Sequence, residues 1–215
     1  MKFAFCTDLC DGLFEIKEDI DCLICCGNFM PIYDKELVTW SIVKQVDWVG
    51  DQLNKWVEKY PSICFVFSGG PNDHLAKFYG SNTNYYLNSN YIQDELMTFK
   101  GLKIYSMPWV PCHFKTMEAN AFKSHDSSFY LSAVDSIPEE TQILVTWNHS
   151  YVNTNCKDIS EQGDIYLKKK IESLKKLEIH AFGQSVEDSV IQQAENHLVV
   201  CSNRTIVGPY TTVKF

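Results

Sequence analysis

Short apolar runs that stop abruptly at small or polar residues are the feature that most constrains this chain. Five such ends occur, at Thr7–Cys10, Cys26–Asn28, Ser68–His74, Thr146–His149 and Phe182–Ser185. Runs of this kind are typical of buried strands, and in open α/β sheets the carboxyl ends of the strands form the crevice in which ligands bind. Any one end is readily explained as an ordinary turn of Gly, Asn and Asp, but five in one chain predict a single shared site.

The alternation of strand-like and helical patterns predicts one α/β domain over residues 1–215. A long amphipathic helix is expected over 36–60, before Pro61, and a second helix over 164–177. Strands are expected at 2–8, 21–29, 62–70, 141–150, 178–185, 196–203 and 210–215, and within 85–109, where Lys100-Gly101 would turn a hairpin. The polar stretch 113–136 is expected to be a long loop with some helix.

The composition excludes several classes of function. A net charge of −8 argues against binding to polymeric nucleic acid, because phosphate neutralisation needs clustered Lys and Arg, and Arg204 is the single arginine. No apolar run approaches the roughly eighteen residues of a membrane span, and the short run at the start contains Asp8, unlike a signal peptide. The nine cysteines lack paired zinc spacing. We therefore expect a cytoplasmic protein with reduced cysteines, no membrane partner and no cofactor.

The order and spacing of the five strand ends resemble the calcineurin-like metallophosphoesterases, in the branch similar to class III cyclic-nucleotide phosphodiesterases. That family carries Asp-x-His, Gly-Asp, Gly-Asn-His-Asp/Glu, Thr-His-Gly and Gly-His-x-His at successive strand ends. The stretches "GLKIYSMPWVP", "EETQILVT" and "LEIHAFGQSVE" add to the resemblance, which runs from Lys2 to about Thr205. The resemblance implies a sandwich of two mixed β-sheets flanked by helices.

Most metal-ligand positions of that family carry other residues here. Asp8 matches the first Asp, but the His that should follow is Cys10, and the Asp that would bridge the two metals is Asn28. Within "SGGPNDH" the alignment leaves open whether Asn72 or Asp73 stands at the His position. Trp147 replaces the His of Thr-His-Gly, and Gln184 and Val186 replace both His of Gly-His-x-His. Divalent ions need several charged or imidazole donors, so the sequence predicts that both metals and catalysis have been lost.

A crevice without metals can still bind a ligand. We expect a pseudoenzyme that holds a nucleotide-type phosphorylated ligand without cleaving it, and that would sequester a cyclic nucleotide signal as a sponge, a role that fits a viral protein. Amides would hydrogen-bond the ligand, Trp147 would stack on a base or else fill the old metal cavity, and His149 would contact phosphate when protonated. The predicted ligand-binding residues are Asp8, Cys10, Asn28, Asn72, Asp73, Trp147, Asn148, His149, Gln184 and Arg204.

Two alternatives remain open from the sequence. A protein-interaction scaffold would use an apolar surface patch. Trp48 and Trp56 lie on roughly one face of the long predicted helix, although core packing against the sheet is the favoured explanation for this pair. A residual phosphodiesterase would use one relocated metal at His149, Asp73 or His74, or the Cys10 thiol as a nucleophile with a histidine as base. The sequence leaves open whether the chain forms a homo-oligomer.

Overall fold

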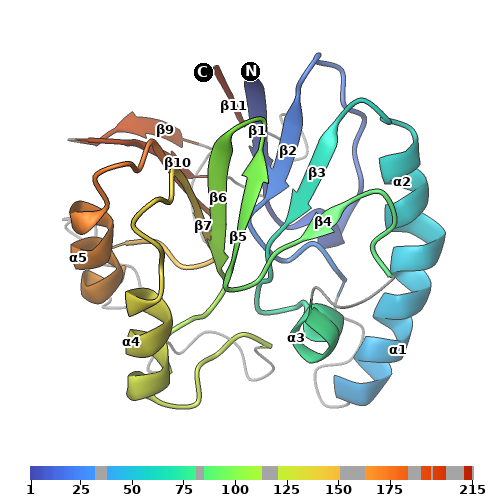
Figure 1. The fold of residues 1–215 in the computed structure, drawn as a ribbon. Coiled ribbons are helices and arrows are strands. Elements are labelled where there is room, and N and C mark those ends of the chain that lie inside the picture. Colours follow the sequence, from blue (N-terminus) through green and yellow to red (C-terminus); the bar gives the residue numbers. More distant parts are fainter. Residues whose placement is uncertain are drawn as a thin grey trace.

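The chain forms two β-sheets that pack face to face between two layers of helices (Figure 1). The computed structural model describes residues 1–31, 38–80, 85–112, 121–150, 163–183, 190–194, 196–201 and 211–214. The first sheet has the order β11-β1-β2-β3-β4 and the second has the order β5-β6-β7-β8-β10-β9. The protein is therefore an α/β sandwich of two sheets, as the sequence predicts.

The strands of the first sheet are β1 (Lys2–Cys6), β2 (Cys22–Cys25), β3 (Cys64–Phe67), β4 (Asn90–Tyr91) and β11 (Thr211–Lys214). Those of the second sheet are β5 (Glu95–Phe99), β6 (Leu102–Met107), β7 (Ile143–Thr146), β8 (Ile179–Phe182), β9 (Val190–Gln193) and β10 (Leu198–Cys201). β1 to β4 are parallel and β11 is antiparallel, while β5 and β9 are the antiparallel edges of an otherwise parallel second sheet. Both sheets are mixed.

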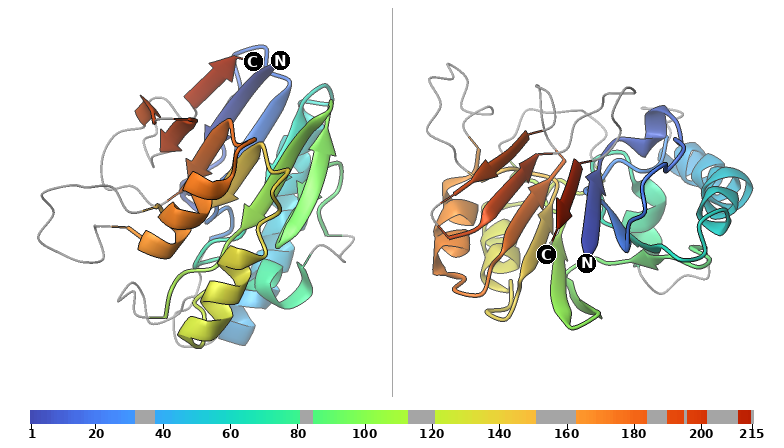
Figure 2. Two further views of the ribbon diagram at one scale, coloured as in Figure 1. Left: turned by 60° about the vertical axis from the view of Figure 1, so that its left-hand side comes forward. Right: turned by 90° about the horizontal axis from the view of Figure 1, so that it is seen from above.

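Helices cover the outer face of each sheet (Figure 2). The first sheet carries α1 (Val38–Trp48), a π-helical turn (Val49–Leu53), α2 (Asn54–Glu58) and α3 (His74–Tyr79), and the second carries α4 (Ser127–Asp135) and α5 (Ile165–Ser173). Pairing of β1 with β11 places the two ends of the chain side by side. Within the described residues, every helix is too short or too polar to cross a bilayer.

Alternation along the strands divides the core into an inner and an outer part. Phe3 and Phe5 of β1 point between the sheets, whereas Ala4 and Cys6 point toward the helices. The inner core joins residues of both sheets, among them Ile24, Val66, Ile143, Val145 and Ile179, all fully buried. Such alternation is the pattern of period two that places successive side chains on opposite faces.

Several predicted elements are present with shorter bounds. The hairpin at Lys100-Gly101 is confirmed, since Phe99 pairs with Leu102 and both turn residues have positive φ, as a two-residue turn requires. Where the sequence predicts one helix over 36–60, the structure has α1, the π-helical turn and α2 in direct succession. α4 supplies the helix expected within 113–136, and Asp126 caps it by accepting a 2.7 Å hydrogen bond from the Phe129 N–H.

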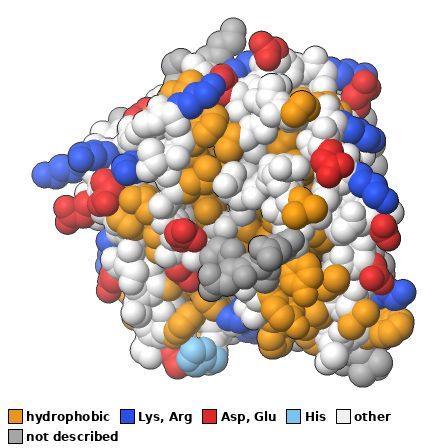
Figure 3. Space-filling view, turned by 45° about the vertical axis from the view of Figure 1, so that its right-hand side comes forward, with side chains coloured by type: hydrophobic (Ala, Val, Ile, Leu, Met, Phe, Trp, Pro, Cys, Tyr) orange, Lys and Arg blue, Asp and Glu red, His pale blue; other side chains and the backbone are white. Residues whose placement is uncertain are grey.

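Hydrophobic side chains gather on the outer surface near α1 and α3 (Figure 3). Five exposed hydrophobic side chains belong to α1, α3 and the segment before β4, and we call them the aromatic patch: Trp40, Val43, Phe78, Tyr79 and Leu87, each between 48% and 65% exposed. Trp56, by contrast, is a core residue that is 4% exposed, and Trp48 is partly buried against the same core. Trp48 and Trp56, which the sequence suggested for an interaction surface, therefore pack toward the core. The residues of the aromatic patch are exposed instead.

Candidate functional site

The carboxyl ends of strands from both sheets meet at one edge of the sandwich. A methyl group added at Gly183, after β8, would lie 2.6 Å from the Cys26 carbonyl oxygen and 2.7 Å from the Thr7 hydroxyl. One added at Gly70, after β3, would lie 2.4 Å from the Asn28 nitrogen. A side chain at either position would clash with its neighbours, so both positions require glycine. The ends of β1, β2, β3 and β8 therefore lie close together, as the sequence predicts.

A chain of hydrogen bonds links the first three strand ends through Asn28. The Asn28 side-chain Nδ2 donates to the Asp8 carboxylate at 2.9 Å, and the Asn28 Oδ1 accepts from the Asn72 N–H at 2.9 Å. Asp8 and Asn28 both have left-handed backbone angles, with φ of 54° and 52°, which Asp and Asn tolerate better than most residues. All three residues are buried. Asn28 thus connects Asp8 to the loop after β3.

Asp73 is a fully buried carboxyl group that organises the same loop. Its two oxygens accept hydrogen bonds from the Met30 N–H at 2.8 Å and the Gly70 N–H at 2.7 Å. Burial raises the pKa of Asp73 to about 8, against the backbone N–H groups that lower it. Burial thus disfavours the charged form of Asp73, whereas the N–H groups on both of its oxygens favour it.

Asn148 and His149 extend the site to the end of β7. Asn148 is fully buried, and its side-chain amide interacts with the Tyr130 hydroxyl. Within the described residues, the Nδ1 atom of His149 lacks a hydrogen-bond partner. Burial lowers the pKa of His149 to about 4, so the imidazole is neutral at pH 7. We call Asp8, Asn28, Asn72, Asp73, Asn148 and His149 the strand-end cluster.

Trp147 lies against the glycines that begin these loops. Methyl groups at Gly27 and Gly183 would come within 2.8 and 2.7 Å of its Cε3 atom, and Gly27 also has a positive φ of 115°. The Trp147 side chain packs with Val110 and is 8% exposed. Stacking on a base needs an open ring face. The contacts of Trp147 therefore favour the alternative in which its side chain fills space between the strand ends.

The remaining predicted residues lie at the margin of the cluster or outside the described residues. Cys10 is partly buried, and its N–H donates to the Asn28 carbonyl at 3.2 Å. Gln184 and Arg204 lie outside the described residues, as does Val186. Within the described part of the chain, no group of three or more His, Cys, Asp and Glu side chains is placed to hold a metal ion.

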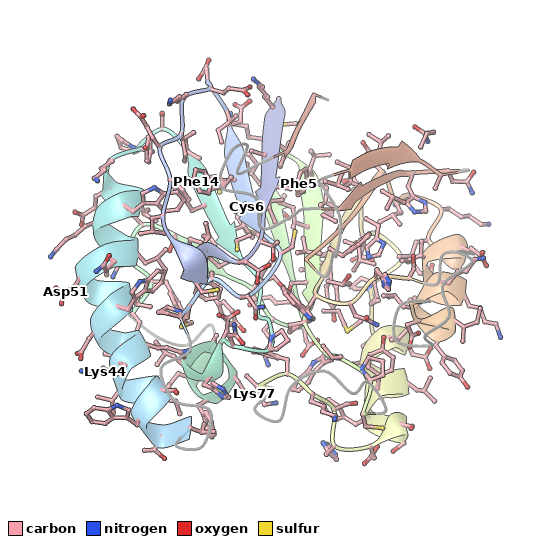
Figure 4. The ribbon with its side chains drawn as sticks, turned by 180° about the vertical axis from the view of Figure 1, so that it is seen from behind. Phe5, Cys6, Phe14, Lys44, Asp51 and Lys77 are labelled. Atoms are coloured by element: carbon pink, nitrogen blue, oxygen red, sulfur yellow. The ribbon has the colours of Figure 1, made fainter. Side chains whose placement is uncertain are left out.

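Gln45 and Lys77 lie near the loop that follows β3, but the sequence analysis did not predict them as site residues. Gln45 of α1 is fully buried and donates from Nε2 to the carbonyls of Pro31 and Asn72, at 3.0 and 2.7 Å. Its position within the apolar stripe of the predicted helix was the available signal. Lys77 of α3 extends toward the second sheet (Figure 4), where its ammonium lies 3.7 Å from the Trp109 ring centroid. Desolvation lowers the pKa of Lys77.

Comparisons with known proteins support the fold. No family model matches the chain, and no curated protein matches its sequence. One crystal structure superposes with a TM-score of 0.59 at 13% identity, covering 93% of this chain and 89% of that chain. The crystal structure of TT1561 of Thermus thermophilus gives a TM-score of 0.57 at 12% identity, over 93% of this chain and 88% of that chain. At these identities the similarity concerns the two-sheet α/β fold alone.

Proposed function

We propose that the chain has a calcineurin-like phosphoesterase fold and is a catalytically inactive member of that class. In this proposal the strand-end cluster binds a nucleotide-type phosphorylated ligand and does not hydrolyse it. The motif order in the sequence and the arrangement of two mixed sheets support the fold. A host that signals with cyclic nucleotides would make such a protein a sponge for the signal.

The observation that carries the binding proposal is hydrogen-bonding capacity left unused at the strand ends. The Asn72 Oδ1 and His149 Nδ1 atoms are buried and lack hydrogen-bond partners within the part of the chain that the structure describes. Buried polar atoms are nearly always paired with protein groups, water or a ligand. Both atoms belong to strand ends that meet at this edge, so a bound ligand with polar groups would satisfy them.

The contacts of Asp8 and Asn28 support the loss of hydrolysis. In the family that the sequence resembles, an Asp bridges the two metals, which activate a bound hydroxide. Here the bridging position carries the neutral Asn28 amide, and this amide occupies the Asp8 oxygen with a 2.9 Å hydrogen bond. Asp8 would have to give up that bond to coordinate a metal.

The charges at this edge are compatible with an anionic ligand. Burial raises the pKa of Asp73 to about 8, which reduces the negative charge that would repel phosphate. Lys77 supplies a partly buried cation that also lies 5.7 Å from the ring of Phe122, the side chain that contacts Gly69. Amide groups and an ammonium can together replace part of the attraction that two metal ions would provide.

Thermal denaturation with a ligand panel tests the proposal. The panel holds mono-, cyclic mono- and cyclic dinucleotides, with and without Mn²⁺, and each ligand is recovered and analysed by chromatography. A binder gains Tm with one member in the absence of metal, and that ligand is recovered intact. Asn72→Ala should abolish the shift, whereas Gln52→Ala, at an exposed helical position, should leave it unchanged. No shift with any nucleotide, or turnover that requires Asp8, would refute the proposal.

The aromatic patch favours a second candidate function, a scaffold that pairs with another copy of itself. Trp40 and Val43 are exposed on α1, Phe78 and Tyr79 are exposed on α3, and these two helices are in contact. An apolar surface of this kind suits an isologous pair, in which the same patch occurs on both partners. Lys44, whose ammonium lies 5.1 Å from the Trp40 ring centroid, is the flanking cation.

Sedimentation equilibrium separates the scaffold from the nucleotide binder. Self-pairing predicts a concentration-dependent dimer that the double change Trp40→Ser and Phe78→Ser returns to monomer. A double change on the opposite helical layer, Ile165→Ser and Tyr166→Ser, is the matched control because these side chains are also 44% and 50% exposed. A wild-type chain that remains monomeric at the highest attainable concentration would exclude pairing through this patch.

A further inference from the structure

Cys22 and Cys64 form a pair of thiols on adjacent parallel strands. They are direct partners in the register of β2 with β3. Cys22 belongs to the core between the sheets and Cys64 packs against that same core, so both side chains lie on one face. Neighbouring strands are about 4.8 Å apart, within the Cα separation of roughly 4.4–6.8 Å that a disulfide spans. The pair is therefore placed for a covalent link.

The pair lies at the end of the sandwich opposite the strand-end cluster, beside the β5–β6 turn (Figure 1). Cys64 is partly exposed and Cys22 is fully buried. The Asn90 Nδ2 lies 3.6 Å from the Cys64 sulfur as a hydrogen-bond donor. Lys100, which also forms an ion pair with Asp21, places a positive charge nearby. One residue of the pair is thus partly exposed to solvent, whereas the other is not.

The two thiols also differ in their ease of ionisation. A hydrogen bond from the Cys22 thiol lowers the pKa of Cys64, and the Lys100 charge adds to this. Burial raises the pKa of Cys22, with the hydrogen bond to Cys64 as a further cause. Thiolates are the nucleophilic form of cysteine, and lower pKa and access to solvent go together at oxidation-sensitive cysteines. Cys64 is the sulfur that an oxidant would meet first.

We propose that Cys64 and Cys22 are an oxidation site at which a hydroperoxide closes a disulfide between β2 and β3. The Cys64 thiolate attacks one oxygen of the peroxide, the O–O bond breaks, and the departing hydroxide takes a proton to become water. The Cys22 sulfur then attacks the resulting sulfenic acid, the S–O bond breaks, and the proton of Cys22 leaves with the hydroxide as a second water. Overall, two thiols and one hydrogen peroxide give one disulfide and two waters.

The chain contains a matched control pair. Cys6 and Cys25 are register partners on β1 and β2, and their thiols are also hydrogen-bonded to each other. Both are fully buried, and their side chains face the helical layer. The strand geometry is the same as for Cys22 and Cys64, so access to the oxidant is the main difference. The proposal therefore predicts that this second pair stays reduced while the protein is folded.

Peptide mapping of the full chain tests the site. The folded protein is treated with hydrogen peroxide, quenched with acid, alkylated under denaturing conditions and digested for mass spectrometry. We expect one cross-linked species that joins the peptides of Cys22 and Cys64 and that dithiothreitol reverses, with Cys6 and Cys25 alkylated. Alkylation of Cys64 after peroxide without a cross-link, or equal cross-linking of Cys6 with Cys25, would overturn the proposal in the wild-type chain.

Substitutions then assign the two sulfurs. Cys64→Ser should eliminate the cross-link, and Cys22→Ser should stop the reaction at a Cys64 sulfenic acid that dimedone traps. Cys6→Ser is the control that should retain the Cys22–Cys64 product. Far-UV circular dichroism checks that each variant folds, and the wild-type map decides the question if one does not. These results are independent of nucleotide binding, because the pair lies at the opposite end of the strands.

Discussion

A single amide, that of Asn28, holds two strand ends together. It donates to the Asp8 carboxylate and accepts from the Asn72 N–H, so it fits its surroundings only as an amide. A carboxylate at this position could keep the second hydrogen bond but would face Asp8 with a like charge. Asn28 is therefore a residue whose side chain stabilises this fold.

Asn28→Asp should accordingly destabilise the protein at neutral pH. We expect a loss of about 3 kcal/mol in the free energy of unfolding at pH 7, because the change breaks a buried hydrogen bond and buries two adjacent carboxylates. The deficit should shrink near pH 4, where one of the two can be protonated. Urea denaturation at both pH values measures it, with Asn88→Asp, at an exposed position with φ of 57°, as the control. Equal stability of Asn28→Asp and wild type at pH 7 would contradict this account.

His180 gives the molecule a predictable dependence on acid. It is fully buried, its Nε2 lies 2.9 Å from the Thr146 hydroxyl, and burial lowers its pKa to about 3, with charges of His197 and His149 contributing. The unfolded imidazole has a pKa of about 6.5, so the unfolded state binds more protons below that value. The stability from His180 is complete above pH 6.5 and is lost as the pH falls toward 3.

The change His180→Gln isolates this effect. By linkage, the His180 contribution to the wild-type free energy of unfolding should fall by about 3 kcal/mol between pH 7 and pH 4. His180→Gln should lose less stability over that range by about this amount, whereas His125→Gln, at an exposed side chain, should behave as wild type. Urea titrations at pH 7, 5 and 4 provide the measurement, and parallel pH profiles for wild type and His180→Gln would show that His180 does not control the acid response.

At the scale of elements, two glycines have opposite surroundings. Gly50 lies in the π-helical turn between α1 and α2, and a methyl group there would meet open space. Gly70 follows β3, and a methyl group there would lie 2.4 Å from the Asn28 nitrogen.

Gly50→Ala should raise the free energy of unfolding by about 0.5–1 kcal/mol, because alanine reduces the conformational entropy of the unfolded chain. Gly70→Ala should lower it by about 2–3 kcal/mol through forced movement of the loop. Thermal melts of both variants test the contrast, and a neutral Gly70→Ala would show that the strand ends are less tightly packed than described.

The elements found from sequence were those with a strong hydrophobic period. β1, β2, β3, β7 and β8 follow from apolar runs, and α5 follows from its spacing. α3 was missed because the turn residues Gly69-Gly70-Pro71 precede it, and a helix of six residues shows little periodicity. β9 was missed because its sequence contains two glutamines and it pairs only as the edge of the second sheet. Local hydrophobic periodicity therefore predicts secondary structure least well where pairing with distant strands or helices determines it.

At the scale of the whole molecule, the site is built by the meeting of two sheets. The order of strand ends predicted that Asp8, Asn28 and Asn72 would lie together, and their hydrogen bonds join them. The position of Trp147 against Gly27, and the reach of Gln45 from α1, depend on how layers pack across the sandwich. Local sequence patterns do not predict the distances between packed elements, so these contacts can be identified only from the structure.

The inner core should make the two sheets unfold as one unit. Val66 of β3 and Val145 of β7 are both fully buried in this core, on opposite sheets. Val66→Ala and Val145→Ala should each lower the free energy of unfolding by about 2–3 kcal/mol, since each leaves a cavity in the same interface. Because the interface is shared, each change should destabilise both halves equally and preserve a single transition.

Fluorine NMR of protein labelled with 5-fluorotryptophan can follow each half separately. Trp56 reports on the helical layer outside the first sheet, and Trp147 reports on the end of β7 in the second. In wild type and in both variants the two native resonances should disappear at the same urea concentration, and that midpoint should be lower in Val66→Ala and Val145→Ala. If Val66→Ala shifted only the Trp56 midpoint, the sheets would be independent folding units. The strand-end cluster, which draws residues from both, would then lose its shape whenever either sheet opened.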